Sequence, residues 1–231
     1  MKARPSSWDA WLSRVRESME PDAIKRSISR FADDSLVKMG ILPPMMDGKG
    51  KVLHISDTPT KMNGYLARAL RRLAPSVVVH TGDLADDIKL ANYPAEAAHY
   101  AAAAKKLINI LLAPHRVVVL ALGNHDRADL LPPLPAQCIL CDNDDAINMT
   151  FFGARFRISH YAERVTDKPE RYNLFGHDPD RESFVDDMDR YFFNGMELMR
   201  IIDPVTGEII TMAYPRETKN ARSMRGGRMV K

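Results

Sequence analysis

Three short, mainly apolar runs, at residues 51–56, 76–80 and 116–122, constrain the fold of this chain more than any other feature. Helical patterns at residues 62–73 and, rich in alanine, at 94–112 separate them. Apolar runs that alternate with helices are typical of strands buried on both faces of a mostly parallel sheet. The sequence therefore predicts an α/β fold.

Beyond Pro135 the pattern changes to shorter strands. These are predicted at residues 137–142, 146–152, 155–161 and 172–175. Near the end, residues 196–203 and 208–214 flank a Pro204–Gly207 turn and predict a hairpin. Parallel units followed by antiparallel strands predict two packed mixed β-sheets flanked by helices, a four-layer αββα sandwich.

The chain divides into three parts. Residues 1–48 predict an N-terminal helical extension and linker, residues 49–215 the main domain, and residues 216–231 a basic tail. Six basic residues against one acid give the tail a charge of +5, which leaves −2 for the rest of a chain whose total is +3. Arg222 and its neighbours have little to bury, so we expect a disordered tail that is a candidate contact for nucleic acid or another polyanion.

The sequence lacks the apolar segments that direct a chain to a membrane. No run approaches eighteen apolar residues, and the amphipathic N-terminus has no signal-peptide core. We therefore expect a soluble, cytoplasmic protein. Cys138 and Cys141 lie three residues apart on a predicted strand, so their side chains point to opposite faces and two reduced thiols are expected.

Polar clusters follow the three apolar runs. They are Asp57 after the first, Asp83 with Asp86 after the second, and residues 124–126 after the third. Because ligand sites in open α/β sheets gather outside the carboxyl ends of the strands, these side chains are expected at one edge. Unpaired carboxylates so close together repel one another, which implies a bound metal ion.

The polar clusters also match known motifs. Gly82-Asp-Leu-Ala-Asp86 matches a GDxxD signature, and Gly123-Asn-His-Asp126 matches GNH[DE]. His54-Ile-Ser-Asp57 resembles an opening strand with its first aspartate, and Phe175-Gly-His177 resembles the start of a GHxH motif. These motifs occur in order across residues 51–214, so the chain resembles the calcineurin-like metallophosphoesterases.

The resemblance implies a two-metal site with a role for each residue. The implied metal ligands are Asp57, Asp83, Asn124, His160 and His177. Asp83 would bridge the two ions, and His160 would fill the family's position for a lone histidine. His125 would be the general acid near the leaving oxygen, oriented by Asp86. A hydroxide activated by one or two divalent ions (manganese, magnesium, iron or zinc) would attack phosphorus in line.

The chain departs from the family pattern at two positions. Pro59 stands where the first motif has a histidine, and Pro179 stands where GHxH has its second histidine. Both missing histidines belong to the first metal in the family, so that site keeps only Asp57 and Asp83, with water. Two carboxylates with water suit magnesium or manganese better than zinc or iron.

Four nearby residues are candidate replacements for the missing histidines. Asp178 and Asp180 would reach the site only if their loop is reshaped. His54 and His80 each precede an aspartate by three residues on a strand, which turns them to the other face and into the core.

These features favour an enzyme that hydrolyses a phosphomonoester or a phosphodiester. Retention of His125 and Asp86 supports catalysis, since folding alone needs neither. The alternative is a weakly active or inactive member of the fold that acts as a binding module. A third hypothesis is a nuclease or nucleotide phosphoesterase that holds polyanions with its basic tail.

Arg127 is a candidate substrate-binding residue, because it follows Asp126 directly and arginine binds phosphate with two hydrogen bonds. A solvated side chain or a salt bridge to a neighbouring aspartate is an equal alternative. The substrate and the oligomeric state do not follow from the sequence.

Overall fold

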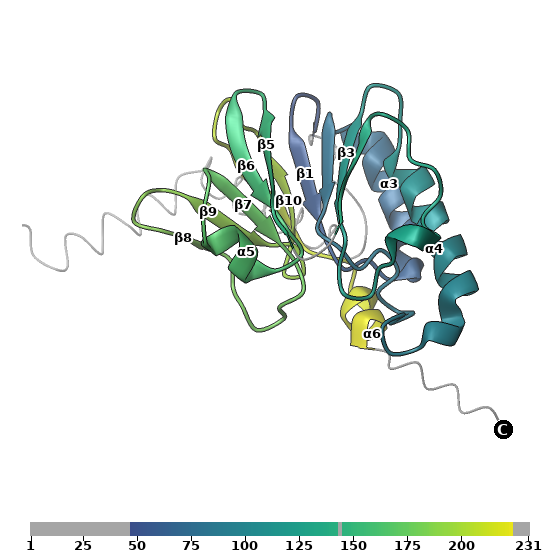
Figure 1. Cartoon of the computed structure of the whole chain (residues 1–231). Helices are drawn as coiled ribbons and strands as arrows, with labels where there is room; N and C mark the ends of the chain where they lie inside the picture. The colour runs from purple at the N-terminus through teal and green to yellow at the C-terminus, as the bar shows by residue number, and fades with distance from the viewer. Residues whose placement is uncertain (1–46, 143–144, 224–231) are drawn as a thin grey trace, which may run out of the picture.

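The computed structural model describes residues 47–142 and 145–223 and shows four layers (Figure 1). Two β-sheets pack face to face, and helices cover the outer face of each. The predicted four-layer sandwich is therefore confirmed. Residues 1–46, which make up almost all of the predicted N-terminal extension, lie outside the described residues.

The first sheet carries the three apolar runs in its centre. Its strands are β1 (Val52–Ile55), β2 (Val77–His80), β3 (Val117–Ala121), β4 (Cys138–Cys141), β10 (Met199–Ile202) and β11 (Ile209–Met212). Their order is β11-β10-β1-β2-β3-β4, and β1 to β4 are parallel. The predicted hairpin is confirmed as β10 and β11, which pair antiparallel, and β10 also pairs antiparallel with β1.

The second sheet has the order β5-β6-β7-β9-β8. Its strands are β5 (Ile147–Phe151), β6 (Ala154–Ile158), β7 (Tyr172–Phe175), β8 (Phe184–Val185) and β9 (Tyr191–Asn194). Strands β6, β7 and β9 are parallel to one another. The sequence did not predict β8 and β9, because they are short and lie in a stretch rich in aspartate and arginine. Asp186 closes the loop between them by accepting from the amides of Met188 and Arg190.

Helices α3 (Asn63–Leu73) and α4 (Ala97–Leu111) cover the outer face of the first sheet, each preceded by a 3-10 turn, η1 (Thr60–Met62) and η2 (Pro94–Glu96). Short α5 (Ala162–Thr166) packs on Phe175 and Phe192 of the second sheet. A third 3-10 turn, η3 (Ala128–Leu130), follows β3. No helix within the described ranges is long and apolar enough to cross a membrane.

Alternate residues of the central strands face the two cores. Val77 and Val79 of β2 pack against the second sheet, while Val78 between them packs against the helices. This two-sided burial explains why the runs are apolar almost throughout. Cys138 and Cys141 also face opposite cores and are both free thiols, as predicted.

The prediction that residues 216–231 are disordered is wrong for the first residues of this tail. Residues Glu217–Ser223 form helix α6, and Arg222 is buried. Its guanidinium donates to the main-chain carbonyls of Asp57 (2.7 Å), Ser56 (2.8 Å) and Met196 (2.6 Å). The composition of residues 216–231 offers little apolar surface to bury. An arginine can nevertheless be buried when carbonyl oxygens satisfy its donors. Residues 224–231 lie outside the described residues.

We expect Arg222→Ala to lower the free energy of unfolding by about 3 kcal/mol, because several buried carbonyls lose a charged donor. Urea unfolding followed by circular dichroism measures this difference. Arg216→Ala is the matched control, since Arg216 is exposed, and it should change stability by no more than about 0.5 kcal/mol. Equal effects of the two substitutions would contradict the packing role of Arg222.

Candidate metal centre

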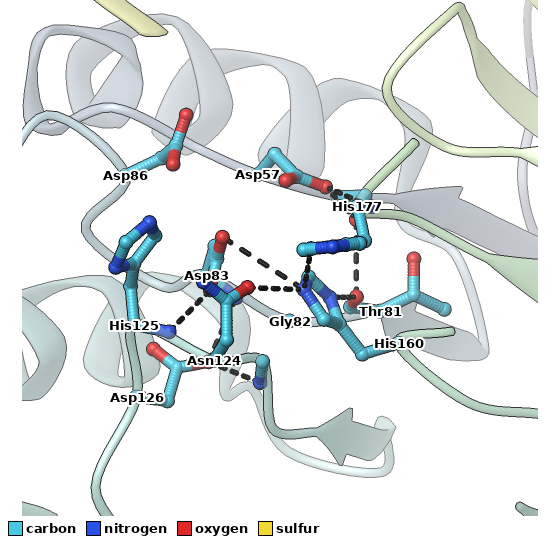
Figure 2. A network of polar contacts seen from close by, with 12 residues as sticks. Asp57, Thr81, Gly82, Asp83, Asp86, Asn124, His125, Asp126, His160 and His177 are labelled. Atoms are coloured by element: carbon cyan, nitrogen blue, oxygen red, sulfur yellow. Dashed lines mark hydrogen bonds and ion pairs between the residues drawn. The ribbon is translucent and has the colours of Figure 1, made fainter. Parts of the chain in front are cut away.

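The implied metal ligands meet at one edge of the two sheets. Asp57, Asp83 and Asn124 follow β1, β2 and β3, which are parallel neighbours with matched ends. His160 and His177 follow β6 and β7 of the second sheet, which are also parallel. Because the carboxyl ends of parallel strands lie on the same side, side chains from five strands surround one space (Figure 2).

Three of these residues have an unusual backbone. Asp57, Asp83 and His177 adopt the left-handed conformation, with φ of 48°, 55° and 64°. Residues other than glycine rarely do so, and each instance costs about 1 kcal/mol or more. Each of the three comes just after a strand, where the chain turns sharply and leaves the side chain at the sheet edge. Backbone strain of this kind clusters at ligand sites.

Two glycines of the motifs are explained by close approach. Gly82 has a φ of 99°, and a Cβ there would collide with Nδ1 of His160. A Cβ at Gly176 would collide with the side chains of Ser56 and Asp57. Any larger residue at either position would therefore displace an implied ligand.

Asp126 joins the turns that follow β2 and β3. Its carboxylate accepts from the amides of Asp83 (2.7 Å), Leu84 (2.9 Å) and Gly123 (2.8 Å), and from the hydroxyl of Tyr100 (2.8 Å). These four donors occupy both carboxylate oxygens. Asp126 therefore positions the neighbouring ligands through the main chain.

The implied ligands of the second metal ion converge around Nε2 of His160. They are Asp83, Asn124, His160 and His177. Nε2 of His160 lies 3.1 Å from Nδ1 of His177, 3.2 Å from Oδ1 of Asn124 and 3.8 Å from Oδ2 of Asp83. Asp83, His160 and His177 each offer a ligand atom within 4.8 Å of the others. Such a mixture of imidazole, amide and carboxylate groups suits manganese, iron or zinc.

The proton on His160 is held away from this space. Its Nδ1 lies 2.6 Å from the carbonyl oxygen of Thr81, which can only accept, so Nδ1 carries the hydrogen. In this tautomer Nε2 faces the other ligands with its lone pair, as is usual for histidines that bind metal. Burial and the nearby His160 lower the pKa of His177, which favours its neutral, ligating form as well. The residues present therefore fit a divalent ion at the second position.

The carboxylates of the site repel one another. Burial raises the pKa of Asp83 well above its usual range, and the charges of Asp57, Asp126 and Asp86 raise it further. A cation beside Asp83 would reverse this shift, because an opposite charge favours the ionised carboxylate.

The first-metal side keeps only its carboxylates. Asp57 and Asp83 are present, and the side chains at positions 59 and 179 are prolines, as the sequence shows. Asp178 does not take the place of the missing histidines. Its Oδ1 accepts from the amides of residues 180 and 181 within its own loop. Two carboxylates without a histidine suit magnesium or manganese better than zinc or iron.

His54 and His80 lie in the core, as predicted. Both are fully buried. Nε2 of His54 lies 3.0 Å from Oγ1 of Thr81, and Nε2 of His80 lies 2.9 Å from Oγ1 of Thr58. Burial lowers the pKa of His80 to about 3, so its ring is neutral at physiological pH. Neither histidine offers a nitrogen to the first-metal side.

Asp86 and His125 lie together on one side of Asp83, while His160 and His177 lie on the other (Figure 2). Ligand atoms of Asp86, His125 and Asp83 are within 4.8 Å of one another. Oδ1 of Asp86 is hydrogen-bonded to Nζ of Lys89. Oδ2 of Asp86 and Nδ1 of His125 are buried and have no partner among the described residues. The expected contact between Asp86 and His125 is therefore one of proximity, without a hydrogen bond.

The pKa values of this pair are also shifted. Burial and the nearby Asp57 raise the pKa of Asp86 to about 6. Burial, together with the positive charge of Lys89, lowers the pKa of His125 to about 4. Both shifts disfavour the charged form of the side chain.

A cleft of about 640 Å³ opens over the site. Its lining comprises Asp57, Asp83, Asp86, Lys89, Asn124, His125, His177, Pro179, Arg181, Glu182, Met196, Glu197 and Arg222. The sequence did not predict that Lys89, Arg181 and Arg222 would line a cleft over the site. Only Lys89 carried a signal there, since it stands three residues after a motif aspartate. Arg222 had none, because its partners are far away along the chain.

Arg127, the candidate phosphate clamp, is not among the residues that line this cleft. It lines a smaller cavity of about 150 Å³ beside Asn124 and His125. Its guanidinium is exposed and paired with the carboxylate of Asp129, with Nε 3.0 Å from Oδ1. Of the alternatives that the sequence left open, the structure shows a salt bridge to a neighbouring aspartate.

Solved structures with a similar fold come from several organisms. One is YfcE, a phosphoesterase from E. coli, with 17% identity and a TM-score of 0.42 over 71% of this chain and 98% of that one. Another is Vps29 from Entamoeba histolytica in complex with Zn²⁺, with 14% identity and a TM-score of 0.41 over 70% and 96%. At these values the likenesses carry no argument about function.

The sequence match is more informative. No curated protein matches the chain, but the family described as calcineurin-like phosphoesterase matches residues 50–212. This match spans well over half of the chain and contains every implied ligand, from Asp57 to His177. The chain therefore belongs to the calcineurin-like phosphoesterase family.

Proposed function

We propose that this chain is a metal-dependent hydrolase that cleaves a phosphate monoester or diester. The observation that carries the proposal is the convergence of Asp83, Asn124 and His177 on the lone pair of Nε2 of His160, at distances of 3.1 to 3.8 Å. A cation would satisfy together these groups, which can all offer electron pairs to one space. When bound, that ion would act as a Lewis acid toward phosphate and would make a bound water molecule more acidic.

His125 is the proposed general acid. It lines the cleft on the opposite side of Asp83 from His160. Its pKa of about 4 makes the ring neutral in the free protein near pH 7. The negative charge of a bound phosphate would raise this pKa, so binding favours the protonated ring that can donate to the leaving oxygen. Asp86, whose Oδ2 has no partner among the described residues, lies where it can accept from that ring.

A binding module is the second candidate function. The observation that favours it is the loss of both histidines on the first-metal side, which leaves Asp57 and Asp83 there. In that case the same cleft would hold a phosphorylated partner without turnover. Turnover with a simple phosphate ester separates the two functions.

Binding of nucleic acid through the basic tail remains a proposal, as does the cytoplasmic location. Arg222 is already occupied by the main chain at Ser56 and Asp57, so the other basic residues of 216–231 would have to supply the contact. A deletion that tests this must begin after Ser223, because one that begins at Arg216 also removes the support of Asp57.

We expect His160→Ala to lower the affinity for Mn²⁺ by about 100-fold or more, because the histidine at the centre of the ligand set is lost. Isothermal titration with Mn²⁺ and elemental analysis of the purified protein measure this. His99→Ala is the matched control, since His99 is largely exposed on α4 and pairs with Glu96. The proposed ligand set would be wrong if His160→Ala bound Mn²⁺ as the unaltered chain does.

We expect Mn²⁺-dependent hydrolysis of an aryl phosphate or a bis-aryl phosphodiester, and His125→Ala should lower kcat by about 100-fold or more. Metal content should stay unchanged in this variant, whereas Asp83→Asn should lose both metal and turnover. If the chain shows no metal-dependent turnover and purifies without metal, the enzyme proposal fails.

We expect Arg181→Ala to raise KM about five-fold, since it removes an exposed charge from the cleft that is worth about 1 kcal/mol. The side chain of Arg181 is 42% exposed and lies 3.4 Å from Asp178. Arg127→Ala is the matched comparison, because Asp129 holds its guanidinium. A larger rise in KM for Arg127→Ala than for Arg181→Ala would restore Arg127 as the phosphate clamp.

A further inference from the structure

A lysine lines the same cleft as Asp57, Asp83 and Pro179, next to Asp86. Nζ of Lys89 is bound to Oδ1 of Asp86, which forms the wall of the cleft beside Asp83. The side chain of Asp86 is 1% exposed, whereas that of Lys89 is 23% exposed. Lys89 therefore neutralises a buried carboxylate while part of its side chain stays open to the cleft.

The backbone holds Lys89 in this position. Its φ of 51° is left-handed, which is rare for a residue other than glycine. Its carbonyl accepts from the amides of Asn92 (2.9 Å) and Tyr93 (3.1 Å), so two hydrogen bonds fix the turn. The placement of the ammonium thus comes from a constrained turn as well as from a flexible side chain.

Arg222 and Lys89 both line the cleft, and they differ in what they can still bind. The guanidinium of Arg222 is occupied by three main-chain carbonyls, including that of Asp57. An ammonium group has three N–H donors, and the bond to Asp86 uses one of them. Of these two residues, Lys89 is therefore the one with donors left to offer a ligand.

We propose that Lys89 takes the place of the first metal ion: its ammonium neutralises Asp86 and binds a phosphate oxygen of the ligand, so that the chain works with one resident ion. The inference rests on the proposed function for the class of ligand, a phosphate ester. A lysine is a compact point charge that suits phosphate, as a metal ion does.

Asp83, Asp86 and His125 form a set that could bind a cation if Lys89 were absent. Ligand atoms of Asp83, Asp86 and His125 lie within 4.8 Å of one another, and two of their buried polar atoms have no partner among the described residues. This set could hold a cation, and it shares Asp86 with Lys89. The ammonium already neutralises one carboxylate of this set, which lowers the attraction of the set for a second cation.

The test compares the unaltered chain with Lys89→Met, which keeps the length of the side chain and removes the charge. Titration with Mn²⁺ should show one ion per unaltered chain. Inorganic phosphate should then bind the Mn²⁺-loaded Lys89→Met chain about ten-fold more weakly, because a charged donor is lost. Lys89→Arg should retain one ion and bind phosphate within about three-fold of the unaltered chain.

Lys105→Met is the control, since Lys105 is exposed on α4 and is not among the residues that line the cleft; it should bind phosphate as the unaltered chain does. A second Mn²⁺ ion that binds Lys89→Met, but not the unaltered chain, would support the proposal further. Two ions in the unaltered chain, or equal phosphate affinity in Lys89→Met, would overturn it. Thermal melting of each variant shows whether it is folded, and Lys89→Gln is the substitute if Lys89→Met is not.

The two proposals can fail separately. Ion stoichiometry and phosphate affinity are measured at equilibrium, without turnover. A chain that binds one ion, and phosphate through Lys89, but hydrolyses no ester would refute the proposed function and leave the role of Lys89 standing. A chain that hydrolyses esters with two bound ions would do the reverse.

Discussion

The carboxylate of Asp126 is the interaction on which the rest of the site depends. Its two oxygens accept from three main-chain amides and one tyrosine hydroxyl, and these donors belong to α4 and to the turns after β2 and β3. Hydrogen bonds to a charged acceptor contribute about 1.5 to 3 kcal/mol each. They stabilise the strained backbone of Asp83 and bring it beside Asn124. A motif aspartate outside the implied ligand set therefore sets the geometry of two implied ligands.

The distribution of charge explains much of the remaining architecture. Asp57, Asp83 and Asp86 are all nearly inaccessible to solvent, and carboxylates buried together destabilise a fold unless cations compensate them. The chain supplies Lys89 on Asp86 and Arg222 behind Asp57, and an ion among the second-metal ligands would compensate Asp83. Binding of an ion among these residues would therefore add to folding stability.

The fold and the convergence of the implied ligands could be predicted largely because their signals are local. An apolar run with a polar residue at its end marks a buried parallel strand, and β1 to β3 lie within about a residue of the predicted limits. His160 and His177 could be assigned because the motif order fixed their place. Strands β8 and β9 carried no such signal, since a charged stretch surrounds a few apolar residues.

Contacts between distant parts of the chain could not be predicted in this way. The main-chain carbonyl of Asp57 is held by a side chain 165 residues later, in a stretch whose composition is that of a disordered tail. The bond between Lys89 and Asp86 depends on a left-handed turn that no short motif encodes. Both contacts depend on positions that only the folded chain defines.

The packing of α6 behind Asp57 also has a consequence for how the protein folds during synthesis. Synthesis proceeds from the N-terminus, and folding generally begins there. All ligands up to His177 have been translated well before Arg222, and β10, the second neighbour of β1, is itself translated late. A nascent chain therefore carries a full set of ligands while Asp57 still lacks its final support. The implied centre therefore gains the support of α6 only after the last of its ligands has been translated.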